Sequence, residues 1–352
     1  MRWLTQGTKR ALSALAGLAI LLSTPAAGAQ EVWSMATPWP GGAFFEDAKN
    51  FANYVEQLTD GRIKIEVFPG GTLGKPLKVT ATVESGVAQI GHNWPGYDWG
   101  IDKTTVVFAN MAGGLTPEEL IFWYTKAGAD QLLEEYRRER FNVMSVFCGV
   151  NPTEIFLHSK KRIETLDDYK GIKQRTAGAW AEIGGALGAS TVILPGAEVY
   201  PALERGVIDA TEWGSPSVNL PVGFHKIAKY IIMPGVHQPG ATEECPVNLD
   251  AWNRISDRDR ELIKLAGRLN ALESWTRHAY ADIAALKEFE NSGNEIVQLS
   301  PDFIAAANKA ADEWADNEAG KNEWFKRVLD DRRSFQADMA AWPRFRFKLG
   351  ER

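Results

Sequence analysis

Cysteine is scarce in this chain: only Cys148 and Cys245 occur among its 352 residues. Two cysteines far apart in the sequence do not make a structural zinc site, which needs a tetrahedral set of ligands. Nothing in the local sequence places the two sulfur atoms together, so we expect two small, buried thiols. The alternative is a disulfide, which an oxidising compartment would allow.

Catalytic signatures are missing as well. The chain contains no G-x-S-x-G elbow, no H-E-x-x-H zinc helix, no Walker-type phosphate-binding loop and no G-x-G-x-x-G after a strand. These absences argue against the common hydrolase, metalloprotease and nucleotide-binding enzyme classes.

The chain also lacks a block of Lys or Arg residues, and its formal net charge is −6. Residues 1–29 carry three positive charges and no negative one, so the rest of the chain has a formal charge of −9. An acidic chain without a basic block is poorly suited to binding nucleic acid or an anionic membrane. An anionic small molecule would therefore need a local positive group.

The N-terminal residues have the pattern of a secretory signal peptide. Basic residues at Arg2, Lys9 and Arg10 precede an apolar run over residues 11–22, and Ala27-Gly28-Ala29 is a small-x-small cleavage site. The apolar run is short for a membrane anchor, which needs ~20 residues. We therefore expect residues 1–29 to be a signal peptide and the mature protein to reach the periplasm of a Gram-negative cell.

The remaining length, about 320 residues, exceeds one typical domain, so two lobes are expected. Residues 32–35, 44–58 and 63–67 read as strand, helix and strand, a βαβ unit that favours a parallel sheet in an α/β fold. Hydrophobic strands at 141–150 and 230–233 mark the crossings between lobes. The expected first lobe is 30–150 plus about 240–278, and the second is 151–239 plus about 279–352.

Several helices follow from hydrophobic spacing. Residues 117–140 predict one long helical region, and residues 301–342 are mostly helical. Ser256 to Glu290 predicts a single long helix with Ser256 as its N-cap. Its expected buried stripe is apolar. The stripe consists of Leu262, Leu265, Leu269, Leu272 and Trp275.

The stretch from Thr165 to Trp213 is the most informative. Arg175 ends a strand-like run and precedes residues 176–178, which we expect to begin a helix; a guanidinium beside free helical N–H groups can hold a carboxylate. Glu212 and Trp213 end a second such run, where α/β folds place pocket groups. The alternative is that Arg175 pairs on the surface with Asp167 or Asp168 and that Trp213 belongs to the core.

Two runs in this stretch resemble the solute-binding proteins of tripartite ATP-independent periplasmic (TRAP) transporters, the DctP family. The first is Asp168-Tyr169-Lys170-Gly171-Ile172-Lys173-Gln174-Arg175, and the second contains Glu198, Tyr200, Ala202, Leu203, Gly206, Ile208 and Asp209. The resemblance implies a two-lobed periplasmic-binding-protein fold with a hinge and a long helix spanning both lobes. It also implies that Arg175 clamps the carboxylate of the substrate.

The pair Glu212-Trp213 is most similar to the branch of the family that binds 2-oxo and 2-hydroxy acids with a metal ion. That likeness implies a Ca²⁺ or Na⁺ ion held by the Glu212 side chain and the Trp213 carbonyl and bridging to the ligand. The branch has a glutamine where this chain has Glu154. Two glutamates favour Ca²⁺, or a cationic ligand group such as an amine in place of the metal. Alternatively, Glu154 is a solvated loop residue.

Further substrate-binding candidates surround this core. Asn151 could bind ligand oxygens or merely satisfy loop backbone. Aromatic candidates of the first lobe would form an apolar lid over a small ligand, with a core role as the alternative. These first-lobe candidates are Trp39, Asn93, Trp94 and Tyr97, and His237, Asn219 and Phe224 are weaker candidates.

The predicted function is therefore a receptor and not an enzyme, delivering a small organic acid to the small and large TRAP membrane subunits. A homodimer through the C-terminal helix is one expectation, because the tail after Ser334 contains Trp342, Phe345 and Phe347; a tail folded onto its own lobe is the other. The rival functions are an exported hydrolase that uses Glu154 and Glu212, and a sensor that presents its ligand to a receptor.

Overall fold

The computed structural model describes residues 30–342. The predicted signal peptide, residues 1–29, and the tail residues Phe345 and Phe347 lie outside the described residues. Within residues 30–342, no helix combines the length and the apolar character that a bilayer span requires.

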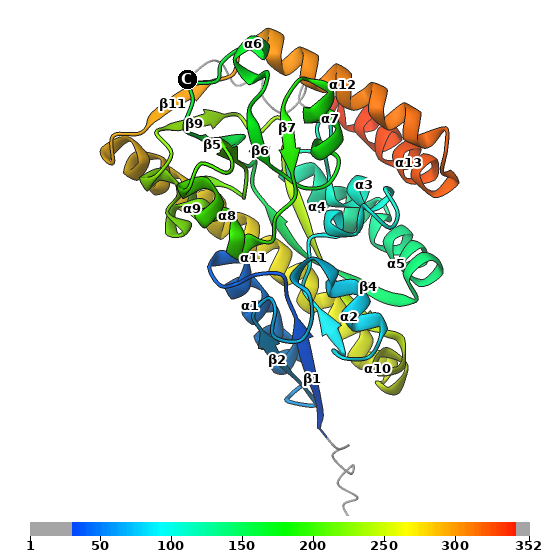
Figure 1. Cartoon of the computed structure of the whole chain (residues 1–352). Coiled ribbons are helices and arrows are strands. Elements are labelled where there is room, and N and C mark those ends of the chain that lie inside the picture. Colours follow the sequence, from blue (N-terminus) through cyan, green and yellow to red (C-terminus); the bar gives the residue numbers. More distant parts are fainter. Residues whose placement is uncertain (1–29, 343–352) are drawn as a thin grey trace, which may run out of the picture.

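Two mixed β-sheets organise the chain into two lobes, as predicted for an α/β binding-protein fold (Figure 1). In the first lobe the strand order is β2-β1-β3-β10-β4, with β1 parallel to β2 and β3 and with β10 antiparallel to β3 and β4. The bounds are β1 Glu31–Ala36, β2 Ile63–Phe68, β3 Ile90–Gly91, β4 Val143–Asn151 and β10 Ala241–Asn248.

The second lobe has the strand order β11-β9-β5-β8-β6-β7. Strand β6 runs parallel to both of its neighbours, and β5 runs antiparallel to β8 and β9. The bounds are β5 Leu157–Ser159, β6 Lys173–Arg175, β7 Ser190–Val192, β8 Ala210–Thr211, β9 Tyr230–Met233 and β11 Glu295–Gln298. The chain passes between the sheets after β4, again after β9, and a third time along the helix α11 (Asp257–Asn291) to β11.

Helices cover both sheets. Those before the first crossing are α1 Ala43–Leu58, η1 Pro76–Lys78, α2 Val79–Glu84, η2 Pro95–Asp98, α3 Thr105–Ala109, α4 Pro117–Lys126 and α5 Ala129–Phe141. Those between the crossings are α6 Leu166–Tyr169, α7 Trp180–Ala186, α8 Gly196–Glu204, α9 Pro216–Asn219, η3 Leu220–Val222 and η4 Phe224–Lys226. The last are α10 Leu249–Arg254, α11 Asp257–Asn291, α12 Pro301–Ala319 and α13 Glu323–Met339.

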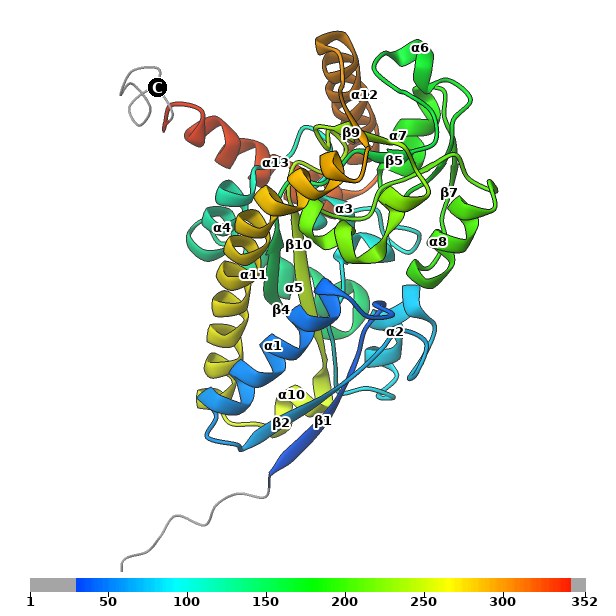
Figure 2. The same cartoon turned by 90° about the vertical axis from the view of Figure 1, so that its left-hand side faces the viewer.

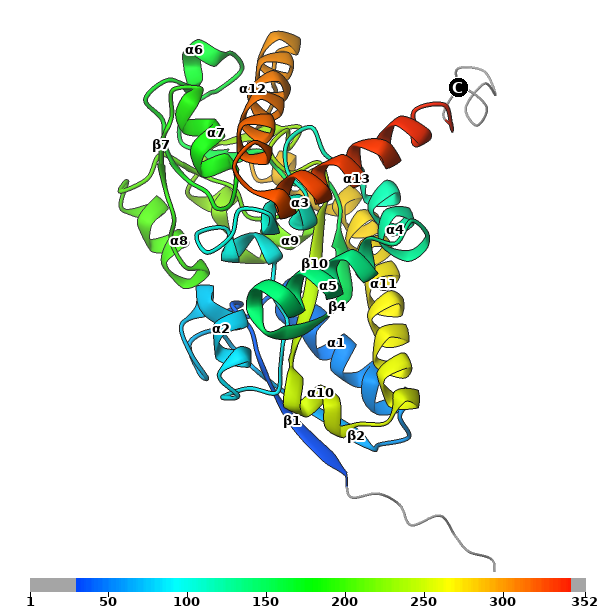
Figure 3. The same cartoon turned by 90° about the vertical axis from the view of Figure 1, so that its right-hand side faces the viewer.

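The long helix α11 packs on α1 and β4 of the first lobe and on α9 of the second, so the prediction of one helix spanning both lobes is confirmed (Figure 2). Its predicted N-cap is also correct, because Ser256 Oγ accepts from Asp259 N at 3.1 Å. The helix α13 lies against α3 and α4 and extends past them toward the end of the described chain (Figure 3).

The predicted buried stripe of α11 is wrong. Leu265, Leu269 and Leu272 are exposed by 42%, 40% and 50%, whereas Gly267 is buried. A methyl group on Gly267 would lie 2.2 Å from the carbonyl oxygen of Phe147 in β4. The helix therefore packs on the sheet through small residues at a close distance, and the leucines occupy another face.

The predicted single helical region at 117–140 is two helices. Thr116 and Glu119 form a capping box at the start of α4, and the helix ends at Lys126. Gly128 adopts φ 94°, a left-handed conformation that glycine tolerates and that cannot continue an α-helix. The apolar residues keep a helical spacing through the turn, so their spacing does not reveal the break that Gly128 makes.

Cys148 and Cys245 form a disulfide, so the expectation of two free thiols is wrong. The two residues lie on the paired strands β4 and β10, where register places Cys245 beside Val146 and their Cα atoms are 5.9 Å apart. That separation is ordinary for a disulfide. The pairing depends on two strands 97 residues apart in sequence, which local sequence does not reveal.

The disulfide should contribute substantially to stability because it closes a long loop in the unfolded chain. Replacing both cysteines with alanine (Cys148→Ala with Cys245→Ala) should lower the free energy of unfolding by about 2–5 kcal/mol. Chemical denaturation of the oxidised wild type and the double variant measures this difference. Superimposable unfolding curves would contradict it.

Candidate functional site

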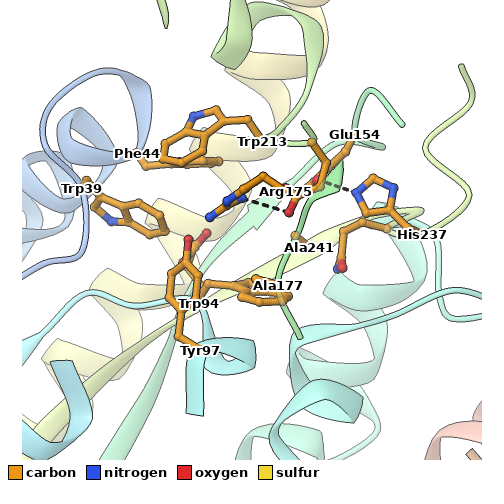
Figure 4. Close-up of a pocket in the computed structure, with 13 residues that line it drawn as sticks. Trp39, Phe44, Trp94, Tyr97, Glu154, Arg175, Ala177, Trp213, His237 and Ala241 are labelled. Carbon is orange, nitrogen blue, oxygen red and sulfur yellow. Dashed lines mark hydrogen bonds and ion pairs between the residues drawn. The ribbon is translucent and has the colours of Figure 1, made fainter. Parts of the chain in front are cut away.

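A cavity of about 30 Å³ lies between the two sheets and is lined by residues of both lobes. Figure 4 shows Arg175 pointing into the space that Trp39, Trp213 and Tyr97 surround. The lining residues are Trp39, Phe44, Trp94, Tyr97, Glu154, Arg175, Ala177, Glu212, Trp213, His237, Gln238, Ala241 and Glu243.

Parallel strands bring the two central polar groups together. Strands β6 and β8 are neighbours, with Arg175 paired to Thr211, so Arg175 and Glu212 leave the sheet at the same edge. Asp209 fixes this register, because its backbone N–H donates to Lys173 O at 2.7 Å and its carboxylate accepts from Lys173 N at 3.1 Å. The two family-like sequence runs thus form adjacent strands.

Arg175 is 1% exposed, so its surface alternative is wrong. Its Nη1 donates to Glu212 Oε1 at 2.9 Å, while Nε and Nη2 donate to the Leu194 carbonyl at 3.2 and 3.0 Å. These bonds engage three of the five guanidinium N–H groups. Asp168 instead caps α6 and Asp167 binds Lys170.

The expected helix start directly after Arg175 is also wrong. Gly178 adopts φ 63°, and the helix α7 begins only at Trp180. Free helical N–H groups are therefore not positioned at Arg175 by this helix. Its neighbours are instead the Trp213 ring, 5.5 Å from the guanidinium carbon, and the Tyr97 hydroxyl.

Aromatic side chains of both lobes form one wall of the cavity. Trp39 contacts Phe44 with ring centroids 4.8 Å apart, and Trp94 contacts Tyr97 at 5.2 Å. The Trp213 ring lies 6.3 Å from that of Phe44, across the interlobe boundary. Four of the predicted aromatic candidates both line the cavity and pack on their neighbours, so the pocket role and the core role apply together. They are Trp39, Trp94, Tyr97 and Trp213.

Glu154 and His237 form a second polar group, with His237 Nε2 3.1 Å from Glu154 Oε2. Burial raises the pKa of Glu154 to about 8, and the positive charge of Arg175 opposes the rise. Burial also lowers the pKa of His237 to about 4. At neutral pH the pair is therefore a neutral carboxylic acid bonded to a neutral imidazole. Glu154 is 7% exposed, so it is not a solvated loop residue.

Glu243 is a lining carboxylate that sequence analysis missed. It is 3% exposed, and its Oε2 has no hydrogen-bond partner among the described residues, while its Oε1 accepts from Asn151 Nδ2 at 3.2 Å. Burial raises the pKa of Glu243 well above its usual range, and nearby carboxylates including Asp47 and Glu154 add to the rise. Its sequence signal is a pair of charged residues, Glu243-Glu244, inside a strand that is buried almost throughout.

Glu244 follows Glu243 at a β-bulge in β10 and anchors this wall. Its carboxylate bonds Arg137, which is fully buried, and Arg137 Nη1 lies 2.9 Å from Asp98 Oδ2. Asp98 adjoins Tyr97 in the chain. One guanidinium therefore fixes the segments that carry both Glu243 and Tyr97.

Four of the predicted site candidates lie outside the cavity lining. Asn151 is one layer behind, bonded to Glu243. Asn93 is 1% exposed and joins β10 through backbone bonds to Glu244. Asn219 supports the wall by donating to Gly214 O at 2.9 Å, and Phe224 packs beneath Trp213. The lining residues that sequence analysis missed are Phe44, Ala177, Gln238, Ala241 and Glu243.

The acidic groups fit a hard cation. One ligand atom each from Glu154, Glu212 and His237 lie within 4.8 Å of one another. Two oxygens that both reach Ca²⁺ at about 2.4 Å can be no farther apart than about 4.8 Å. Carboxylate oxygens are the donors that such ions prefer, so Glu154 and Glu212 could hold Ca²⁺ or Na⁺.

A family model for the bacterial extracellular solute-binding proteins, family 7 (DctP), matches residues 35–321. The chain belongs to the DctP family. It is therefore a solute-binding receptor of the TRAP type, as the sequence resemblance predicted. A monocarboxylate 2-oxoacid-binding periplasmic protein of Nostoc sp. strain PCC 7120 is 31% identical over 313 residues, covering 89% of this chain and 86% of the relative.

Solved structures of the same kind share the fold of this DctP-family receptor. A TRAP solute-binding protein from Bordetella bronchiseptica, a mixed-occupancy dimer with calcium and picolinate, is 26% identical with a TM-score of 0.86, covering 90% of this chain and 94% of that chain. A TRAP protein from Pseudoalteromonas atlantica with sodium and pyruvate is 29% identical with a TM-score of 0.84, covering 90% and 97%.

The Glu154 carboxyl gives this receptor a testable pH dependence. Its pKa is about 8 in the folded protein against a usual 4.5, so the folded state favours the proton and this stabilisation is present at low pH. It should be lost as the pH rises from about 5 to about 8. In ligand-free protein with chelator, the melting temperature of the wild type should fall relative to Glu154→Gln across this range. Parallel curves for the two proteins would contradict the shift.

Proposed function

We propose that this receptor captures a small 2-oxo or 2-hydroxy carboxylate, together with a cation, in the cleft between its lobes. The observation that carries the proposal is the buried guanidinium of Arg175, two of whose five N–H groups are engaged by neither Glu212 nor Leu194. These two groups lie on the side of the Tyr97 hydroxyl, which lines the same cavity. A carboxylate can accept two parallel bonds from such a pair. The small cavity suits a ligand of few atoms.

The chemistry of the ligands in the similar proteins supports this class. The Nostoc relative is named for 2-oxoacids, and the two solved structures contain picolinate or pyruvate. Picolinate and pyruvate share a carboxylate with a second donor atom beside it, nitrogen in one and the oxo oxygen in the other. Both can therefore chelate a cation through two atoms, and a 2-hydroxy acid can do the same.

In this receptor the cation would be held by Glu212, the Trp213 carbonyl and Glu154. With Glu154 and Glu212 ionised, Arg175 positive and a monocarboxylate bound, the site carries a formal charge of −2 before the metal enters, provided that Glu243 stays protonated as its raised pKa implies. Calcium neutralises that sum and sodium leaves one negative charge. The proposal therefore favours Ca²⁺ over Na⁺, and the cation supplies the charge that makes two buried glutamates tolerable.

The remaining predicted site residues have supporting roles in this proposal. Trp39, Trp94 and Tyr97 exclude water above the ligand, and His237 holds the Glu154 carboxyl until the cation replaces the proton. Asn93 and Asn151 support the wall from behind. The low-polarity surroundings strengthen each remaining charge interaction with the ligand.

A hydrolase acting through Glu154 and Glu212 is disfavoured. The family model that matches the chain describes solute-binding proteins, and the Nostoc relative is named for binding 2-oxoacids. Burial raises the pKa of Glu212, but its bond to Arg175 opposes that rise and so disfavours a protonated general acid at this position.

The same proposal includes the compartment of the receptor, its membrane partners, its lobes and its oligomeric state. It would be exported to the periplasm after loss of residues 1–29 and would deliver its ligand to the small and large TRAP membrane subunits. The lobes would be residues 30–150 with about 240–278, and 151–239 with about 279–352. A homodimer through the C-terminal helix belongs to the proposal as well, supported by the dimeric Bordetella structure.

Removing the guanidinium should abolish most ligand binding. Arg175→Ala leaves the ligand carboxylate and Glu212 without their cationic partner in a buried site, so affinity for pyruvate with Ca²⁺ should fall at least about 100-fold. Arg162→Ala is the matched control, because Arg162 lies on the surface of the same lobe and pairs with Glu164 and Glu295. Near-normal affinity of Arg175→Ala in calorimetry would overturn the clamp.

The cation should be required for binding and should depend on Glu154. Pyruvate should raise the melting temperature with Ca²⁺, less with Na⁺, and not with chelator, because a ligand that binds only the folded state stabilises it. Glu154→Gln removes one negative charge and should lower the ratio of the affinity for Ca²⁺ to the affinity for Na⁺ by about 10-fold or more. Exposed Glu198→Gln is the control. Equal stabilisation by pyruvate in chelator would contradict the metal bridge.

A further inference from the structure

Two glycines in the second-lobe wall lie directly against side chains of the first lobe. A methyl carbon built on Gly178 would lie 2.6 Å from Cη2 and 3.3 Å from Cζ3 of Trp94. One built on Gly214 would lie 3.1 Å from Cζ of Phe44 and 2.9 Å from Cγ1 of Val218. We call Gly178 and Gly214 the interlobe glycines. Neither position has room for even the smallest side chain.

These contacts cross the cleft. Trp94 follows β3 and Phe44 lies on α1, both attached to the first sheet, whereas Gly178 follows β6 and Gly214 follows β8 of the second sheet. Trp94 and Phe44 also line the ligand cavity, and they belong to one apolar cluster that includes Val218 of the second lobe. The rings therefore meet bare backbone at the points where the two lobes come together.

We propose that Gly178 and Gly214 are affinity-determining residues that permit full closure of the cleft over the ligand. Their part is to supply no side chain, so that the edges of Trp94 and Phe44 approach the backbone of the opposite lobe. The inference rests on the proposed function, because closure matters for affinity only if the ligand is held between the lobes.

The size of the obstruction at Gly178 explains the expected effect. Non-bonded carbons prefer a separation of about 3.5–4.0 Å, so a methyl at 2.6 Å must move the Trp94 ring by about 1 Å. Trp94 packs on Tyr97, whose hydroxyl is a neighbour of Arg175. A displaced ring therefore opens the aromatic wall and admits water, although every polar ligand contact of the second lobe remains present.

The backbone of Gly178 requires a matched control, because its φ of 63° is itself unfavourable for alanine. Gly171 lies in the same lobe with φ 72°, and a methyl there would have no atom within 4 Å. Gly171→Ala therefore imposes a similar backbone cost without an interlobe contact. The difference between the two variants isolates the obstruction of closure.

The test measures affinity for pyruvate with Ca²⁺ and the radius of gyration by X-ray scattering, with and without these ligands. Gly178→Ala should bind at least about 10-fold more weakly than Gly171→Ala and should remain more extended when ligand is saturating. Gly214→Ala should change in the same direction by less, because its methyl would contact Val218 of the same lobe more closely than Phe44 of the other. Equal affinities and equal radii for Gly178→Ala and Gly171→Ala would overturn the proposal.

A second substitution at Trp94 distinguishes obstruction of cleft closure from damage within the lobe that carries Gly178. Trp94→Phe removes the two ring atoms nearest to Gly178, so adding Gly178→Ala to Trp94→Phe should cost much less affinity than adding it to the wild type. A cost that is the same in both backgrounds would overturn the proposal, because the methyl would then act within its own lobe.

Failure of the proposed function gives a different result. A wild type that does not bind pyruvate with Ca²⁺ contradicts the ligand assignment, whatever the glycines do. The interlobe glycines are then tested with picolinate and Ca²⁺, the pair bound by the similar Bordetella protein. A larger radius for Gly178→Ala than for Gly171→Ala at saturating picolinate and Ca²⁺ supports their role in closure, and equal radii overturn it.

Discussion

The arrangement of the cleft follows from the free-energy cost of burying the Arg175 guanidinium away from water. Burying a charge is costly unless it is paired and hydrogen-bonded. Arg175 meets this need through Glu212, the Leu194 carbonyl and the face of Trp213, all in its own lobe. Parallel pairing of β6 with β8 makes the arrangement possible, since it brings two distant sequence runs to one sheet edge. The remaining N–H groups are thereby oriented before a ligand arrives, which lowers the entropic cost of binding it.

The acidic side of the site follows from the same constraint. One guanidinium balances Glu212 alone, so burial keeps Glu154 protonated through a pKa of about 8. A cation that displaces this proton changes a neutral acid into a metal ligand, and so couples metal, proton and anion in one small cavity. The first-lobe wall is comparatively fixed, because Arg137 ties Asp98 to Glu244. We infer that closure moves a rigid aromatic wall onto a preformed polar site.

The sequence alone predicted the features that depend on short-range residue patterns. The strand ends at Arg175 and Glu212, the long capped helix and the two-lobed order all follow from short-range signals. Other features depend on strands or helices that meet in space. The disulfide joins strands 97 residues apart, and Glu243 faces the cavity only because β10 returns to the first sheet. The buried face of α11 was predicted wrongly, because the spacing of apolar residues does not distinguish a face that packs closely on a sheet from a row of exposed leucines.

A crystal structure of the mature protein with pyruvate and Ca²⁺ would show whether Arg175 and a bridging cation hold the ligand together. We expect closed lobes, the pyruvate carboxylate accepting two bonds from Arg175, and an anomalous peak for calcium bounded by Glu154, Glu212 and the Trp213 carbonyl. A pyruvate molecule bound away from Arg175, or bound in the cleft with no cation between it and Glu212, would contradict this expectation.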